Sequence, residues 1–277
     1  MNSQLSADVY MQEYTRDDII ARYISDSAGD GIAYILHHVY APTYLRAIRE
    51  LMSSRPKGHV FRVMEYGCGG GMNLLRIVEL LRSEGAALER GYGADFSPPM
   101  IDAARKEASR HLPGELNAKL TFVVAGNENL ASDLCKELQV AKNELAGSFD
   151  LIVGVNTTRY AHRLNRENEL ARDIFELLRP AGQTIMIDMN RYFPFFRSRV
   201  REGFAKRGAE TYIPSLKEYT RPFRDSGFEI KESRNFCWIP HSANQNLLKI
   251  CRALTPVLET CCSPLAMRSL VVGRRPV

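Results

Sequence analysis

The chain of 277 residues lacks the features that mark membrane and secreted proteins. Residues 1–14 are polar and contain no apolar core of the kind found in a signal peptide. No uninterrupted apolar run approaches the roughly 18 residues that span a bilayer. The six cysteines form no C-x-x-C pair, and no other metal-ligand spacing is evident. We therefore predict a cytoplasmic protein with reduced thiols, no disulfide framework and no bound metal.

A concentrated basic patch is also missing. Lys and Arg total 37 against 32 Asp and Glu, which gives a net charge of +5, and the basic residues are spread along the chain. A nucleic-acid partner is therefore not expected. Internal repeats and low-complexity tracts are absent as well. With 45% hydrophobic residues, the chain can bury a core as one large domain, or as one domain with an appendage.

From residue 59 onward, apolar segments alternate between strand and helix patterns. Such alternation predicts a parallel sheet covered by helices on both faces, with the carboxyl ends of the strands at one edge, where ligands bind. The strand candidates are 60–66, 90–94, 120–125, 151–155 and 184–188, and the helical patterns between them are 74–82, 99–109, 130–142 and 167–178.

The two ends of the chain depart from this alternation. Residues 17–52 have helical spacing, with a break expected at Asp30-Gly31 and a further helix opening at Pro42. Near the other end, strand-like segments 228–238 and 269–273 enclose a helix-like segment, 246–261, which Pro256 bends or divides. We therefore divide the chain into an N-terminal helical lid, 1–55, and a main domain, 56–277, with insertions near 190–215 and 241–266.

A glycine-rich turn follows the first strand and carries the most specific signal. Glu65-Tyr66-Gly67-Cys68-Gly69-Gly70-Gly71 places glycines where backbone can approach a ligand closely. A dinucleotide fingerprint would need its third glycine at Met72, and the G-K-[ST] of a P-loop is absent. The spacing E-x-G-x-G-x-G therefore favours another nucleotide-type cofactor.

The second strand ends in an acid followed by apolar residues. Asp95 can accept hydrogen bonds from both hydroxyls of a ribose, and Phe96 and Met100 can enclose a flat purine. Ser97 is placed to cap the next helix. These positions indicate an adenosine-containing cofactor.

At these residues the chain resembles the class I S-adenosylmethionine-dependent methyltransferases, over about residues 56–190. Five motifs of that family occur in order: 65–71, Asp95, 125–130, 149–156 and 177–183. The resemblance implies a doubly wound, mostly parallel α/β sheet of seven strands with the last strand antiparallel. It also implies S-adenosyl-L-methionine as cofactor and S-adenosyl-L-homocysteine as product. The cofactor-binding residues that it implies are Glu65, Gly67, Cys68, Gly69, Gly71, Asp95, Phe96, Met100, Gly126, Asn127 and Asn156.

The chain departs from the family's pattern at two positions. Asn127 stands where the family usually has Asp, and Ala181 replaces a glycine. An uncharged Asn127 can still accept from and donate to the edge of an adenine.

The acceptor site is expected beside the end of the fourth strand. His162 is a candidate general base, or a histidine of the loop, and Tyr160 is a second catalytic candidate that contacts cofactor or substrate. Arg159 either holds an anionic group of the acceptor or faces solvent. Four further substrate-binding candidates could equally be packing residues: Tyr34 and His37 in the amino-terminal helices, and Arg191 and Tyr192 after the fifth strand.

The main hypothesis is methyl transfer to an oxygen, nitrogen or sulfur atom of a small molecule by in-line displacement. A nucleic-acid or protein methyltransferase is the second hypothesis, although no Pro-Pro run follows Asn156 as exocyclic-amine methylation of bases would require. A nicotinamide-dependent oxidoreductase and a non-catalytic, cofactor-binding partner subunit are two more hypotheses. The helix-like segment 246–261 could also join two copies into a homodimer.

Overall fold

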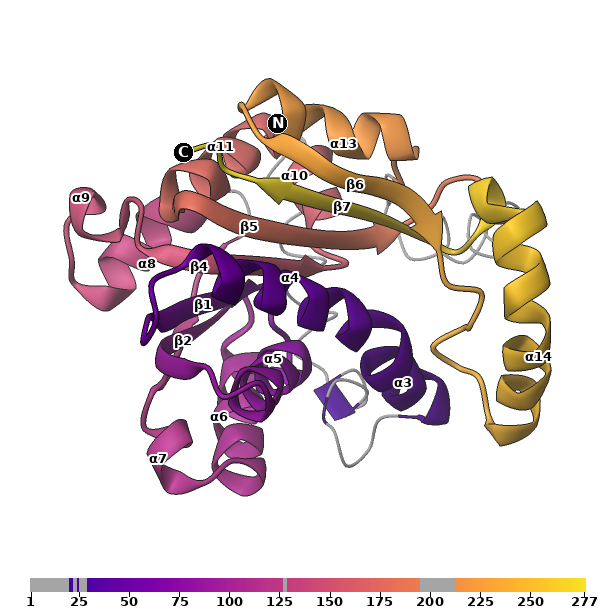
Figure 1. Cartoon of the computed structure of the whole chain (residues 1–277), viewed down its shortest axis with the longest axis horizontal. Helices are drawn as coiled ribbons and strands as arrows, with labels where there is room; N and C mark the ends of the chain where they lie inside the picture. Colours follow the sequence, from indigo (N-terminus) through magenta and orange to yellow (C-terminus); the bar gives the residue numbers. More distant parts are fainter. Residues whose placement is uncertain (1–19, 22–23, 25–28, 127–128, 195–212) are drawn as a thin grey trace.

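A seven-stranded sheet forms the centre of the protein in a computed structural model, which describes residues 20–21, 24, 29–126, 129–194 and 213–277. The strand order is β3-β2-β1-β4-β5-β7-β6 (Figure 1). Strand β7 is antiparallel to both β5 and β6, whereas β1 to β5 pair in parallel. The predicted strands and the fold class are confirmed. The strands are β1 (Val60–Tyr66), β2 (Ala87–Asp95), β3 (Leu120–Val124), β4 (Phe149–Val155), β5 (Leu178–Met189), β6 (Glu229–Phe236) and β7 (Arg268–Arg274).

Helices cover both faces of this sheet because the central strands β1, β4 and β5 bury side chains on both sides. Helix α5 shows the pattern: Leu74, Ile77 and Leu81 lie on one side of it and are buried against the sheet. One core lies under η3, α4, α5 and α6, and the other under α8, α11 and α13. The helices of the Rossmann-like alternation are α5 (Met72–Ser83), α6 (Pro98–His111), α7 (Gly114–Asn117), α8 (Leu130–Leu138), α9 (Lys142–Leu145), α10 (Thr158–Arg163), α11 (Glu167–Leu177) and α13 (Leu216–Asp225).

One predicted helix is shorter than expected. In the segment 130–142, α8 ends at Leu138 because Gln139 adopts a left-handed backbone conformation, with φ of 55°, and α9 begins only at Lys142. Nothing in the periodicity distinguishes this position, since glutamine is an ordinary helix former.

The amino-terminal helices also differ from the prediction. The chain is helical without interruption through α3 (Asp30–Tyr34), the π-helix η3 (Ile35–Tyr40) and α4 (Ala41–Ser54). Asp30 and Gly31 begin this helical run, and Pro42 lies in the first turn of α4 as predicted. The helix that the break was expected to separate from this run lies before Gly29, where the structure describes only residues 20–21 and 24. Tyr44 and Ile48 of α4 are fully buried in the main core. Helix α4, within the segment that we expected to be a lid, thus belongs to the helical layer that packs on the sheet.

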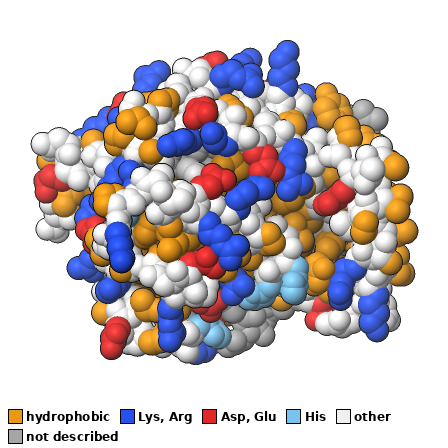
Figure 2. Space-filling view, in the orientation of Figure 1, with side chains coloured by type: hydrophobic (Ala, Val, Ile, Leu, Met, Phe, Trp, Pro, Cys, Tyr) orange, Lys and Arg blue, Asp and Glu red, His pale blue; other side chains and the backbone are white. Residues whose placement is uncertain are grey.

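Helix α14 (Gln245–Cys261) stands apart from the sheet and runs through Pro256 without a break (Figure 1). Leu248 is its only fully buried residue. Hydrophobic side chains gather over this helix at the right of Figure 2, and those that are exposed include Leu247, Ile250, Leu254 and Val257. Among the residues that the structure describes, none of the helices has the length and apolarity needed to cross a bilayer.

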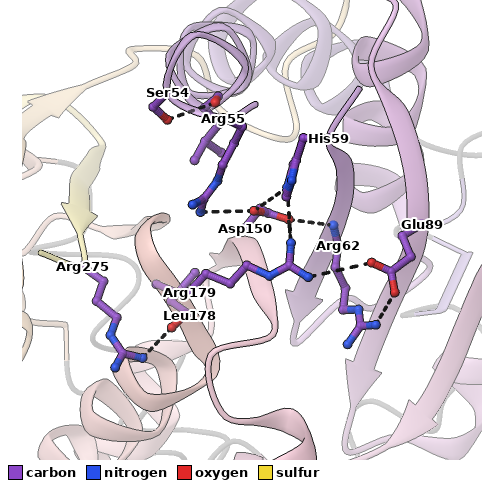
Figure 3. A network of polar contacts seen from close by, with 10 residues as sticks. Ser54, Arg55, His59, Arg62, Glu89, Asp150, Leu178, Arg179 and Arg275 are labelled. Carbon is purple, nitrogen blue, oxygen red and sulfur yellow. Dashed lines mark hydrogen bonds and ion pairs between the residues drawn. The ribbon is translucent and has the colours of Figure 1, made fainter. Parts of the chain in front are cut away.

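A charge network closes the amino edge of the sheet, where the parallel strands begin (Figure 3). Asp150, at the start of β4, is fully buried and accepts hydrogen bonds from the backbone N–H of Arg62 and from Arg179, both at 3.0 Å. His59 lies 3.0 Å from the same carboxylate and Arg55 lies 3.2 Å from it. This carboxylate is thus surrounded by donors within the protein.

Candidate active site

A pocket opens at the opposite edge, above the carboxyl ends of β1, β2 and β4. Its walls come from α3 and η3, the glycine-rich turn, the residues after β2 and β4, and His241. Nine of the residues singled out from the sequence line it: Glu65, Gly67, Cys68, Gly69, Asp95, Phe96, Met100, Asn156 and Tyr160.

The glycine-rich turn adopts the conformation that its sequence predicts. Gly67, Gly69 and Gly71 have φ of 61°, 51° and 81°, values that glycine adopts without strain. The N–H of Gly71 donates to the carbonyl of Cys68 at 2.8 Å, which closes the turn, and α5 begins at the next residue. The backbone at Gly67 and Gly69 can therefore approach a ligand closely beside the start of α5, where anionic or polar ligand groups are favoured.

Glu65 is buried at the end of β1. One carboxylate oxygen accepts from the side-chain amide of Asn73 at 2.7 Å, and the other accepts from the N–H of Leu74 at 2.8 Å. Burial raises the pKa of Glu65 to about 8 despite these two donors. A cation beside this carboxylate would offset the cost of its burial and favour its ionised form.

Asp95 connects the end of β2 to the glycine-rich turn. Its Oδ2 accepts from the N–H of Gly69 and its Oδ1 from the N–H of Ser97, both at 2.9 Å. Burial raises its pKa to about 6. Each oxygen keeps further lone-pair capacity toward the pocket, so the carboxylate can still accept from ligand hydroxyls.

Two predicted cofactor residues are not among those that line the pocket, and one lies outside the described residues. Gly71 is the N-cap residue of α5, and the N–H of Gly126 donates to Asp133 at 2.9 Å. Asn127 lies outside the described residues.

The segment after β4 sends its side chains in two directions. Asn156, with φ of 59°, and Tyr160 line the pocket. His162 instead lies 2.9 Å from Glu167, in a separate hollow that also includes Arg159, Glu218 and Tyr219. Arg159 is buried, with its backbone N–H donating to Asp188 at 3.1 Å and its guanidinium to the hydroxyl of Tyr160 at the same distance. Of the two catalytic candidates, Tyr160 therefore lines the pocket and His162 lies in a different hollow.

The other substrate candidates do not line the pocket. Tyr34 packs against His38 and Arg252 of α14, and His37 is exposed. Arg191 donates to the carbonyl of Ile213 and pairs with Glu218 at 3.0 Å, while Tyr192 is exposed. For Arg191, these contacts favour a packing role.

Several pocket residues were not assigned to the site from the sequence. Tyr40, at the end of η3, and His241, just after β6, line it together with Ile32, Ile35 and Leu36. Behind them, Arg268 donates to Asn156 and to His241, each at 2.6 Å. Only the aromatic and histidine content of these segments was visible in the sequence, since nothing local indicates that residues near 40, 241 and 268 meet.

Comparison with known proteins identifies the type of domain. The sequence model of a family described as "methyltransferase domain" matches residues 59–250. The chain is 30% identical over 156 residues to a non-reducing polyketide synthase of Aspergillus terreus (strain NIH 2624 / FGSC A1156). That match covers 55% of this chain but spans only 5% of the much longer synthase.

Solved methyltransferase structures share the fold. The CMeT domain of the citrinin polyketide synthase has a TM-score of 0.58 at 15% identity, covering 94% of this chain and 56% of that one. The CurJ carbon methyltransferase has a TM-score of 0.58 at 11% identity, covering 95% and 59%. An S-adenosylmethionine-dependent methyltransferase from Mesorhizobium loti has a TM-score of 0.57 at 18% identity, covering 87% and 100%.

Proposed function

The chain belongs to the methyltransferase-domain family; on that premise we propose that it transfers a methyl group from S-adenosylmethionine to a small molecule bound in the pocket above β1 and β4. The supporting observation is that one pocket contains both a carboxylate pair suited to the cofactor, Glu65 and Asp95, and a second region with polar groups of its own. An electron pair of the acceptor would form the bond to the methyl carbon as the bond from that carbon to sulfur breaks, so the pocket would have to hold the two groups in line.

The residues present fit this cofactor. Glu65 would neutralise its ammonium group, which is consistent with a carboxylate whose pKa burial has raised. Asp95 would accept from the ribose hydroxyls, with Phe96 and Met100 beside the adenine and Gly126 near its edge. The backbone of the glycine-rich turn would contact the cofactor at Gly67, Cys68, Gly69 and Gly71. Asn156 would lie beside the methyl group of the cofactor. When bound, S-adenosylmethionine supplies an activated methyl group, so the protein's tasks are alignment and exclusion of water.

Tyr160 is the better placed of the two catalytic candidates because it lines the pocket. A role for His162 as general base would require its side chain to leave the hollow that it shares with Glu167 and turn toward the acceptor. We therefore propose that alignment by Tyr160 contributes more than proton transfer by His162.

A carbon acceptor is the second candidate. The relative from Aspergillus terreus is a polyketide synthase, and two of the similar structures are a polyketide CMeT domain and a carbon methyltransferase. These similarities favour adding a fourth kind of acceptor atom to the oxygen, nitrogen and sulfur predicted from the sequence. It is an enolisable carbon between two carbonyl groups.

Calorimetry with S-adenosylmethionine, S-adenosylhomocysteine and NAD tests the cofactor assignment. We expect micromolar-range binding of the first two and none of NAD. Methyl transfer from labelled cofactor to a metabolite panel that includes a β-keto thioester then tests the acceptor class. Transfer only to RNA or to protein substrates would contradict the proposal in favour of a macromolecular acceptor.

A further inference from the structure

Arg268 is a buried guanidinium with uncharged hydrogen-bond partners. It is 1% exposed and lies at the first position of β7, on the face toward η3 and α4 where Leu270 and Val272 also pack. It donates to the amide oxygen of Asn156 and to Nε2 of His241, and its Nε is buried without a partner. In the part of the chain that the structure describes, no carboxylate pairs with it. A buried charge in this state is costly unless an anion compensates for it.

Arg268 also determines which groups its two partners can offer to the pocket. An arginine only donates, so the oxygen of Asn156 is occupied and its NH₂ is the group left to face a ligand. His241 must accept at Nε2, which places its proton on Nδ1. Burial, together with Arg268 and Arg159, holds the pKa of His241 well below its usual range. His241 is therefore a neutral donor and not a general base.

Tyr40 adds a third donor at the same end of the pocket. Tyr40 is 4% exposed and lines the pocket, yet its hydroxyl is buried with no hydrogen-bond partner among the residues that the structure describes. Burial raises the pKa of Tyr40 to about 12, so the phenol keeps its proton. A buried hydroxyl without a partner is costly, and a bound ligand that accepts from it would recover that cost.

We propose that these three side chains, the donor cluster of Tyr40, Asn156 and His241 backed by Arg268, bind the methyl acceptor through an oxygen that carries negative charge. Carboxylates, phenolates and enolates share this chemistry. An acceptor that only donates, such as an ammonium group, would meet donors and a buried positive charge. The inference rests on the proposed function, since it names the acceptor chemistry of the same pocket.

The experiment measures binding of matched probes to the protein loaded with S-adenosylhomocysteine, by saturation-transfer NMR and competition. The probe pairs are benzoate with benzamide and acetoacetate with acetoacetamide, which differ chiefly in charge. We expect each acid to bind about tenfold more tightly than its amide, because hydrogen bonds to charged groups are the stronger ones. In Arg268→Met the preference should disappear, and in Tyr40→Phe acid binding should weaken about fivefold or more.

The controls separate this inference from the cofactor assignment. Arg234→Met removes the same charge from an exposed pair with Glu232 and should leave the acid preference intact. Tyr40→Phe removes a hydroxyl that has no partner, so the thermal stability of the ligand-free protein should not fall.

Binding of S-adenosylhomocysteine should stay within about twofold in all three variants, and its absence from the wild type would instead overturn the proposed function. Equal binding of acid and amide, no binding of either acid, or an acid preference that persists in Arg268→Met would overturn the donor cluster.

Discussion

The two edges of the sheet differ in whether their buried charged groups are paired with oppositely charged groups of the protein. At the amino edge, Asp150 is enclosed by donors and cations of the protein itself (Figure 3). At the carboxyl edge, Arg268 has no carboxylate partner among the described residues, the hydroxyl of Tyr40 has no partner, and burial raises the pKa of Glu65.

This difference separates stabilising groups from ligand-binding groups. The carboxylate of Asp150 is paired by donors within the chain, so it stabilises the fold and needs no ligand. Buried groups left unsatisfied cost stability, and a ligand that pairs with them recovers that cost as binding free energy. Substitutions at the two edges should therefore differ in the quantity that they change most.

The largest effect on stability is expected from Asp150→Asn. This change leaves Arg55, Arg179 and His59 around a neutral group, and breaking a buried ion pair costs about 3–5 kcal/mol. Chemical denaturation should show this loss, while the folded variant still binds the cofactor normally. Asp102→Asn, in an exposed pair with Arg105, is the matched control and should change stability little. If Asp150→Asn lowered the free energy of unfolding by less than about 1 kcal/mol, the proposed difference in stabilisation between the two edges would be wrong.

At the carboxyl edge, Asp95→Asn should reduce cofactor affinity about 100-fold and lower stability by about 1–3 kcal/mol, because the NH₂ of asparagine leaves one of the two backbone N–H donors without an acceptor. The variant loses the charge that would strengthen the bonds to two ribose hydroxyls. The raised pKa of Asp95 shows that burial already disfavours the ionised carboxylate, so the loss of the charge itself should weaken the fold less than it does at Asp150. Calorimetry measures the change. Unaltered affinity would contradict the assignment of this strand end to the cofactor.

A pH effect on stability is expected from Glu65 at the carboxyl edge. Its folded pKa of about 8 exceeds the ordinary value of 4.5, so the native state binds more protons than the unfolded state between these limits. The stability of the ligand-free protein should consequently fall as pH rises from about 4.5 to 8.

The same shift predicts proton release on binding. Near pH 7 a cationic cofactor should ionise Glu65 and release up to about one proton, which titration calorimetry in two buffers detects. Glu65→Gln should abolish the release. Proton uptake by the wild type, or equal release by Glu65→Gln, would assign the linkage to another group.

The smallest effect on the fold is expected from Leu254→Asp in α14, which belongs to neither edge. Leu254 is 50% exposed, so the change should alter stability by less than about 0.5 kcal/mol. If α14 joins two copies, as its apolar face suggested from the sequence, gel filtration should show a dimer for the wild type and a monomer for the variant. A marked loss of stability would instead show that this face is covered within the chain.

The sequence alone determined the sheet, the glycine-rich turn and the acid that ends β2. Strand and helix periodicity is local, and this turn needs glycine wherever its φ is positive. These features can therefore be predicted from the sequence without knowledge of tertiary contacts. The end of α8 could not be predicted from the sequence, because Gln139, which is neither glycine nor asparagine, adopts a left-handed conformation there.

Only the tertiary structure decided the other half of the site. Tyr40, His241 and Arg268 lie far apart in the chain and meet because η3 packs on the sheet while β6 and β7 join its edge beside β5. Likewise, the fold places Tyr160 in the pocket and His162 in another hollow, although both lie in the same short helix. The physical reason is that strand and turn propensities depend on near neighbours, whereas a missing hydrogen-bond partner can be recognised only when all surrounding groups are in place.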